Sequence, residues 1–210
     1  MDQAKAIAAA AAIDEDLGRR IEFIYEIDRL KNVLRQTLLV DGSRKENSAE
    51  HSWHLAMIAI VMAPHARGDI DLAKVMRILL VHDIVEIDAG DVDIYDYEAR
   101  TRKEAEEVEA ADRIFGLLPE PEATELRDAW EEYEARETAE AKFAYACDRL
   151  QPFLLNLAIG GQSWTRRGVT ADEVKAINGR MVDGLDGIWD YAEALIDEAV
   201  IEGTIEPGPD

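Results

Sequence analysis

The chain is organised around the stretch Leu79-Leu-Val-His82-Asp83-Ile-Val-Glu86-Ile-Asp-Ala-Gly-Asp91. An apolar run ends there in an adjacent imidazole and carboxylate, which are costly to bury unless a charged or hydrogen-bonding group satisfies them. A divalent cation would satisfy both. On a helix, Glu86 returns to the face of His82 and Asp83 one turn later. The stretch therefore predicts a polar site, although a His-Asp pair taken alone is more often two core side chains bonded to their neighbours.

Length and cysteine usage predict one soluble, cytoplasmic domain. The 210 residues fit a single domain with a sizeable core, and neither a signal segment nor a run of 18 apolar residues is found. Cys147 is the one cysteine, which excludes an intramolecular disulfide, and its apolar surroundings indicate a buried structural thiol. We expect Trp53 to fill the core between helices.

The charge balance restricts the partners. With 45 acidic and 23 basic residues the net charge is −22, which repels nucleic-acid backbones and anionic membranes. We therefore expect no nucleic-acid partner and no membrane partner. A small phosphate substrate would also be repelled, so a phosphate site needs local Arg or Lys side chains and a metal ion.

We expect an all-α fold, a helical bundle. Ala, Glu, Leu, Ile and Arg dominate, and no run of alternating β-branched residues indicates a sheet. An Ala-rich segment (1–13) precedes a single domain (14–202), and a tail with two prolines and two glycines (203–210) is expected to be disordered. Apolar periodicity predicts the main helices at about 14–40, 48–63, 71–87, 100–115, 121–135, 137–159 and 171–201.

Four candidate metal ligands stand out because each is hard to justify in a helical core without a common partner. They are His51, His82, Asp83 and Asp148, from three different predicted helices. Two imidazoles and two carboxylates suit Mn, Co, Fe, Zn, Ni or Mg, and the absence of thiolate argues against a closed structural zinc site. Open coordination positions predict metal-assisted hydrolysis, in which the cation activates water and polarises a phosphoryl oxygen.

His51, the adjacent His82-Asp83 and the distant Asp148 resemble the H…HD…D signature of the HD-domain metal-dependent phosphohydrolases. The segments around Arg35, His51, His82 and Asp91 are similar to those of the HD-domain 5′-deoxynucleotidases, a subgroup with bacterial and eukaryotic members. The resemblance covers roughly residues 15–160 and implies a homodimer that binds a divalent cation. Gln36 departs from the bacterial pattern, which has an aromatic residue at that position.

The resemblance implies a role for each site residue. The metal ligands are His51, His82, Asp83 and Asp148. The acid/base carboxylates are Glu86 and Asp91. Arg35 is the phosphate-binding arginine, and Arg44 is a candidate second anion contact, with a helix-capping or surface ion-pair role as the alternative. The implied activity is removal of the 5′-phosphate from (deoxy)nucleoside 5′-monophosphates.

Two other functions stay open on the sequence. One is an HD-type hydrolase of nucleoside triphosphates or signalling nucleotides, which would need more basic side chains than Arg35, Lys31 and Arg44 supply. The other is a non-catalytic regulatory module that binds a metal or a nucleotide. Glu86 and Asp91 argue against the module, because binding alone requires neither carboxylate.

Overall fold

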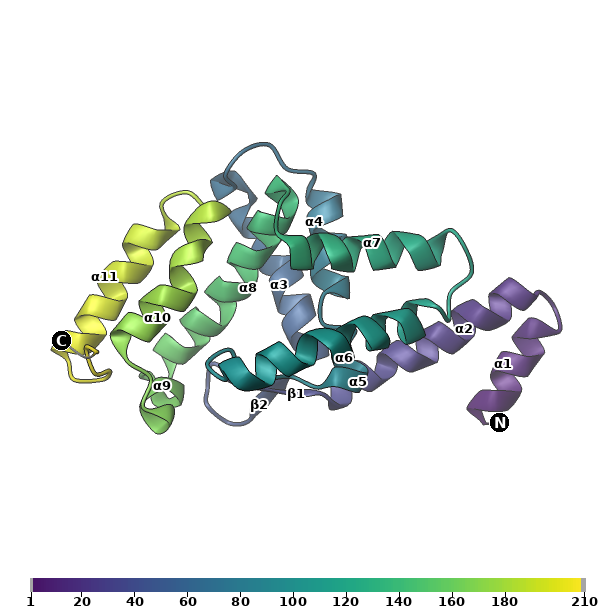
Figure 1. The fold of residues 1–210 in the computed structure, drawn as a ribbon, viewed down its shortest axis with the longest axis horizontal. Helices are drawn as coiled ribbons and strands as arrows, with labels where there is room; N and C mark the ends of the chain where they lie inside the picture. Colours follow the sequence, from purple (N-terminus) through teal and green to yellow (C-terminus); the bar gives the residue numbers. More distant parts are fainter. Residues whose placement is uncertain (1, 209–210) are drawn as a thin grey trace.

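The computed structural model describes residues 2–208, apart from the side chains of residues 97, 99, 100 and 102. It confirms the all-α class, because helices form nearly all of the architecture (Figure 1). The main helices are α1 (Gln3–Ala11), α2 (Glu15–Ile27), α3 (Ser48–Met62), α4 (Leu72–Val81), α5 (Glu86–Ala89), α6 (Tyr97–Phe115), α7 (Glu122–Ala135), α8 (Ala139–Ala158), α9 (Gln162–Arg167), α10 (Ala171–Asn178) and α11 (Ile188–Ile201). Three 3-10 turns, η1 (Asp28–Asn32), η2 (Ala63–His65) and η3 (Gly179–Asp183), connect them.

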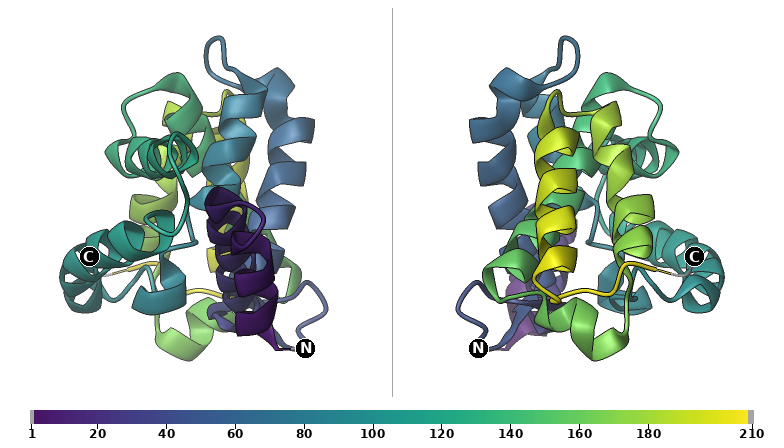
Figure 2. Two further views of the ribbon diagram at one scale, coloured as in Figure 1. Left: turned by 90° about the vertical axis from the view of Figure 1, so that its right-hand side faces the viewer. Right: turned by 90° about the vertical axis from the view of Figure 1, so that its left-hand side faces the viewer.

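Helix α8 runs through the middle of the bundle and packs against α3, α4 and α7 (Figure 1). The C-terminal helices α10 and α11 lie side by side on one flank, as the right-hand view of Figure 2 shows. Polar side chains fix where the helices begin. Asn47 and Glu50 form a capping box on α3, and the side chains of Asp71 and Thr138 accept backbone N–H groups at the starts of α4 and α8.

The core has two parts, and the stretch around His82 passes between them. Val75, Ile78 and Leu79 belong to the cluster built with α3 and α8. Val81, Ile84 and Val85 belong to the second cluster, built with α6, Trp130 of α7 and the end of α2. His82 and Asp83 therefore lie at the junction of two apolar cores, with 4% and 7% of their surface exposed.

The helix predicted for residues 14–40 is wrong beyond Ile27. The chain continues as η1 and then as strand β1 (Leu34–Leu38), which pairs antiparallel with β2 (Lys45–Asn47) with an irregular register. Burial follows the strand period here, because Leu34 is 57% exposed whereas the next residue, Arg35, is 8% exposed. The strand thus turns Arg35 inward.

The helix predicted for residues 71–87 ends earlier, at Val81. The backbone then tightens into a turn, in which Ile84 donates to the Val81 carbonyl and Glu86 to the Asp83 carbonyl, both at 3.0 Å. Helix α5 follows at Glu86. Glu86 therefore reaches the site through a turn between two helices, and not by the helical spacing that the sequence indicated.

The predicted helix 171–201 is split into α10, η3 and α11. Gly184 lies at the end of η3, where a Cβ would lie 2.2 Å from the Lys142 carbonyl oxygen of α8, so the chain passes against α8 there. The tail also differs from its predicted disorder up to residue 208. Ile205 is buried, and Ala171 donates to the Glu206 carbonyl at 2.7 Å. Residues 209–210 lie outside the described part.

Two predictions about single side chains have opposite outcomes. Cys147 is buried in α8, as expected, and burial raises the pKa of its thiol. Trp53 is not a core residue, because 64% of it is exposed on the outer face of α3. No helix in the described part of the chain is long and apolar enough to cross a bilayer.

Candidate metal centre and adjoining cavity

The four predicted ligands come together from α3, the α4–α5 turn and α8. His51 Nε2 lies 2.9 Å from Asp148 Oδ1 and 3.9 Å from Asp83 Oδ2. His82 Nε2 lies 3.0 Å from Asp83 Oδ1 and 4.0 Å from Asp148 Oδ1. All four residues are buried. The side chains that the sequence separates by up to 97 positions thus face one point.

The nitrogen atoms are arranged as ligands. His82 Nδ1 donates to the Leu79 carbonyl at 2.9 Å, which leaves Nε2 with its lone pair toward the cluster. Among the described residues, that buried Nε2 has no hydrogen-bond partner. Potential ligand atoms of His51, His82 and Asp83 all lie within 4.8 Å of one another. The cluster therefore fits a divalent cation, which would satisfy the unpaired nitrogen and offset the carboxylate charge.

Burial and neighbouring charges set the protonation of the cluster. Burial lowers the pKa of His82 to about 4, so this imidazole is neutral near pH 7, as a ligand must be. Burial and Arg35 also act to lower the pKa of His51, but its contacts with Asp148 and Glu46 outweigh them and raise the pKa to about 9. Burial opposes ionisation of Asp148, yet Arg149 and His51 hold its pKa well below the usual range.

Arg35 reaches the cluster from strand β1. Its Nη1 donates to Asp83 Oδ2 at 2.8 Å and lies 3.9 Å from Asp91 Oδ1. Its Nε lies 3.8 Å from Glu46 Oε2. The predicted phosphate-binding arginine is therefore beside the metal candidates, held among three carboxylates.

Glu86 and Asp91 lie on the cavity side of the cluster. Glu86 Oε2 accepts the Ser48 hydroxyl at 2.7 Å, and Glu86 Oε1 pairs with Lys103 Nζ at 3.2 Å. Burial and the nearby Asp83 raise the pKa of Glu86 to about 7. Asp91 Oδ2 accepts the backbone N–H of Gln36 at 3.1 Å, which ties the loop after α5 to strand β1. Near neutral pH, Glu86 can both accept and release a proton.

Arg44 lies outside this site. Its guanidinium is exposed and binds both carboxylate oxygens of Glu50, at 2.8 and 2.7 Å, while Glu50 also caps α3. The geometry matches the surface ion-pair alternative and not the anion contact. The carboxylate beside His51 Nδ1 is Glu46, at 3.5 Å.

Several side chains at the site were missed by the sequence analysis. Tyr133 donates its hydroxyl to Asp148 Oδ2 at 2.7 Å, and Arg149 donates to the same oxygen at 2.5 Å. Glu46 and Lys103 contact His51 and Glu86, respectively. A basic residue next to Asp148 in an apolar helix was a usable signal for Arg149. Tyr133 and Lys103 come from distant helices and gave none.

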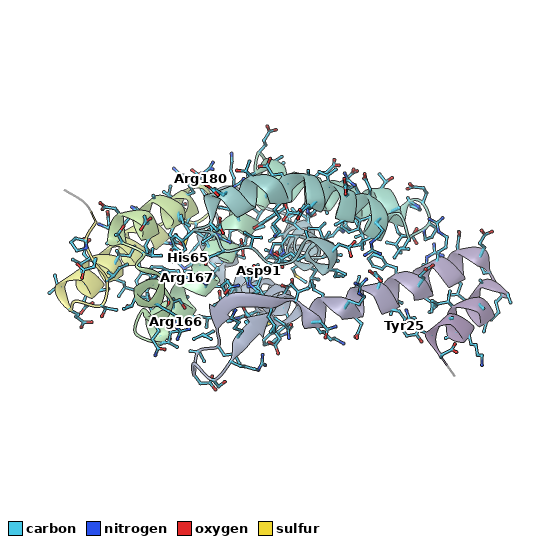
Figure 3. All side chains as sticks on the ribbon, turned by 60° about the horizontal axis from the view of Figure 1, so that its bottom comes forward. Tyr25, His65, Asp91, Arg166, Arg167 and Arg180 are labelled. Carbon is cyan, nitrogen blue, oxygen red and sulfur yellow. The ribbon has the colours of Figure 1, made fainter. Side chains whose placement is uncertain are left out.

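A cavity of about 230 Å³ opens beside the cluster. It is lined by His82, Asp83, Glu86, Asp91 and Asp148 at the metal end, and by α8, α9 and α10 further along. Arg167 of α9 pairs with Asp93 at 2.5 Å and donates to Gln36 Oε1 at 3.3 Å. Figure 3 shows the two sides, with Asp91 over the centre of the molecule and Arg167 on α9 to its left.

The helical bundle and its buried His, His-Asp and Asp cluster define an HD domain. A model of the HD domain family matches residues 27–189, and the chain belongs to that family.

Relatives and solved structures extend the comparison. The chain is 33% identical over 136 residues to "5′-deoxynucleotidase HDDC2" of Bos taurus, covering 64% of this chain and 64% of the relative. It is 30% identical over 149 residues to the Xenopus laevis protein of the same name, covering 70% and 73%. The chain thus spans about 64% of the length of the bovine relative.

A crystal structure described as a "predicted metal-dependent phosphohydrolase" from Magnetospirillum magnetotacticum MS-1 is 49% identical, with a TM-score of 0.87. That match covers 92% of this chain and 100% of the other. A conserved hypothetical protein from Pyrococcus furiosus, at 21% identity and a TM-score of 0.57, shares the fold alone.

Proposed function

We propose that this protein is a metal-dependent phosphohydrolase that removes the 5′-phosphate from (deoxy)nucleoside 5′-monophosphates. The observation that carries the proposal is the convergence of Arg35 and Glu86 on the His51, His82, Asp83 and Asp148 cluster, at the end of a cavity. The names of the bovine and frog relatives support the substrate class.

The chemistry divides among the cluster and three side chains. His51, His82, Asp83 and Asp148 would hold a divalent cation, which would supply Lewis acidity and lower the pKa of water at the site. Arg35 orients the phosphoryl group with its guanidinium and offsets charge on the phosphoryl oxygens.

The water oxygen forms the new bond to phosphorus, and the bond from phosphorus to the 5′ oxygen breaks. Glu86 and Asp91 take up the proton that water loses and return one to the 5′ oxygen. Glu86 suits this role because the raised pKa, about 7, makes both of its protonation states accessible near neutral pH.

The rival functions make different predictions. A triphosphate or signalling-nucleotide hydrolase draws support from the cavity, which five basic side chains line: Arg35, Lys103, Arg136, Arg149 and Arg167. Four of them, all but Arg136, are paired with carboxylates, however, which leaves less positive charge than a triphosphate requires. A regulatory module would bind a metal or nucleotide without turnover.

Phosphate release from a panel of nucleoside mono-, di- and triphosphates, with each divalent metal, tests the proposal. We expect 5′-monophosphates to be hydrolysed in preference to 3′-monophosphates and triphosphates, with little base selectivity. Triphosphate hydrolysis with inert monophosphates would support the first rival, and metal binding without any turnover the second. Comparable rates for deoxyribose and ribose forms would remove the sugar preference alone.

Two arginine variants test whether Arg35 binds the phosphoryl group of the substrate. Arg35→Ala should lower kcat/KM by about 100-fold or more, because a charge-assisted contact at a buried site is lost. Arg44→Ala is the matched control, since it removes the same side chain from the exposed pair with Glu50. Equal, small effects of both changes on kcat/KM would mean that the phosphate is held elsewhere.

We also infer a homodimer and a cytoplasmic location. Support for self-association comes from an exposed apolar stripe on the outer face of α3, formed by Trp53, Met57, Ile60 and Val61. Light scattering after gel filtration should give twice the chain mass for the wild type and the single chain mass for Val61→Glu. A wild-type monomer at micromolar concentration would contradict the dimer.

A further inference from the structure

The cavity has a second positively charged region, away from the histidines. The guanidinium of Arg136 lies 4.9 Å from the centre of the Tyr145 ring, and that of Arg149 lies 5.5 Å from the same centre. All three side chains line the cavity. The Tyr145 ring therefore contacts two guanidiniums, and because Asp148 pairs with Arg149 and not with Arg136, a further anion beside Arg136 is favoured.

Arg136 is held in an uncommon backbone conformation. It caps the C-terminus of α7 with φ +52°, and within residues 2–208 it is the one non-glycine residue with a positive φ. Glycine or asparagine adopts this conformation at lower cost. Its Nε donates to the Glu134 carbonyl at 3.3 Å. No described carboxylate lies within ion-pair distance of its guanidinium, so its charge is available to a ligand.

Arg149 also has a hydrogen-bond donor without a partner in the described part of the chain. Its Nη2 donates to Asp148 Oδ2, whereas its buried Nε has no hydrogen-bond partner among the described residues. Asp148 presents Oδ1 to His51 and Oδ2 to Arg149. The guanidinium is therefore on the other side of this carboxylate from the histidine pair. An anion bound there would be distinct from the phosphoryl group at the metal centre.

The other basic side chains of the cavity are already neutralised. Arg35 pairs with Asp83, Lys103 with Glu86 and Glu107, and Arg167 with Asp93. Glu137 adjoins Arg136 in sequence and Glu134, which also lines the cavity, lies two positions before it; both residues are exposed, so solvent screens their charges. Arg149 is also paired, with Asp148, so among the described residues Arg136 carries the unpaired positive charge of the cavity, and Arg149 adds its unpartnered Nε donor.

We propose that Arg136, Tyr145 and Arg149 form a second phosphate subsite, which holds a phosphoryl group other than the one being hydrolysed. Two guanidiniums match the several acceptor oxygens of a phosphate and supply charge-assisted hydrogen bonds. This inference rests on the proposed function for the identity of the first phosphoryl group. The second group belongs either to the same nucleotide, as a 3′-phosphate, or to inorganic phosphate bound beside the nucleotide.

Binding of uncleavable ligands tests the subsite without requiring turnover. Calorimetry on the metal-loaded protein compares the 5′-phosphonate analogue of deoxyadenosine monophosphate with the same analogue carrying a 3′-phosphate. A second titration adds inorganic phosphate to protein saturated with the first analogue. The test variant is Arg136→Asn, since asparagine tolerates a positive φ and Arg136 contacts no candidate ligand of the metal. The matched control is Arg166→Asn, which removes an arginine of α9 outside the cavity lining.

We expect either the 3′-phosphorylated analogue to bind about tenfold more tightly than the plain analogue, or inorganic phosphate to bind beside the plain analogue. The first result identifies a phosphate of the nucleotide as the occupant, and the second a free phosphate. Arg136→Asn should abolish the gain, whereas Arg166→Asn should retain it.

Two results would overturn the subsite. One is the absence of both effects in the wild type, and the other is an equal loss in the two variants, which would indicate a general effect of net charge. Failure of the proposed hydrolysis is separable, because it would be seen as absent phosphate release from cleavable nucleotides while the binding difference persists.

Discussion

His51 and Asp148 lie on the uninterrupted helices α3 and α8, whereas His82, Asp83 and Glu86 lie at the break between α4 and α5. The first pair is oriented by side chains, because Glu46 faces His51 and both Tyr133 and Arg149 bind Asp148. The second group is oriented largely by the backbone turn and by the Leu79 carbonyl, which holds His82.

Because of this difference, metal affinity and proton transfer at the site depend on different contacts. A side-chain contact can be deleted by substitution while the backbone is retained. Substitutions around the helix-borne pair, His51 and Asp148, should therefore change metal affinity by degrees. The turn places Glu86 beside the cluster without making it a ligand candidate, so proton transfer can be altered with the metal retained.

The largest effect is expected from Asp148→Ala. This change removes a candidate ligand and leaves Tyr133 and Arg149 without their acceptor, so metal binding should be lost and the metal-free protein should be less stable by about 3 kcal/mol. Calorimetric metal titration and thermal unfolding measure the two effects. Asp186→Ala, at an exposed position, is the control. Unchanged metal affinity in Asp148→Ala would remove this residue from the ligand set.

Glu86→Gln comes next and should affect the other half of the site. Turnover should fall by about 10² to 10⁴-fold while metal affinity stays within about twofold. The pKa of Glu86 is raised to about 7, so the fraction of its ionised form increases as pH rises through 7. If Glu86 acts as the base, kcat should rise across that range and level off above it. The pH dependence should be absent from the residual activity of the variant, and unchanged kcat at full metal occupancy would exclude the role.

The sequence predicted the buried polar cluster but not the strand beside it. His51, His82, Asp83 and Asp148 were identifiable because buried polar residues in apolar helices need a common partner, and the structure brings them together. Strand β1 was missed because Leu30, Leu34 and Leu38 recur at a helical spacing, although a strand forms. Its pairing with β2 depends on residues across the Asp41–Ser43 turn, and local periodicity does not report such pairing.

The contacts that support the site were harder to predict than the candidate metal ligands. Arg44 was a candidate anion contact, with a helix-capping or surface ion-pair role as the alternative. The basic side chains that line the cavity besides Arg35 are instead Lys103, Arg136, Arg149 and Arg167, from four other elements. Tertiary packing alone determines which basic side chains meet there. Charge composition indicated that such residues were necessary, without indicating their positions.

Glu46→Gln is expected to give an intermediate effect on the helix-borne pair. The substitution keeps the volume and weakens the partner of His51 Nδ1, so metal affinity should fall by about 10- to 100-fold. Glu50→Gln is the control, because Glu50 contacts Arg44 and the α3 cap instead of a ligand candidate. Cobalt-loaded protein gives a second readout, since a reoriented imidazole should change its visible absorption. Equal metal affinities for the two variants would mean that Glu46 does not position His51.

The smallest effect should come from Ser48→Ala, which affects only Glu86, one of the residues at the break between α4 and α5. The Ser48 hydroxyl donates to Glu86 Oε2 at 2.7 Å, so its loss destabilises the ionised carboxylate and raises the pKa of Glu86 further. The rise of kcat with pH should then move to higher pH, and kcat at pH 7 should fall by about tenfold or less. Metal affinity should not change, because Ser48 contacts none of the four candidate ligands. Ser52→Ala removes an equally buried hydroxyl one turn along α3, which donates to the Ser48 carbonyl at 3.0 Å, and should leave the pH profile in place. If both variants shifted the pH profile equally, the effect would come from packing in α3. Proton transfer by Glu86 could then not be altered independently of the helices that carry His51 and Asp148.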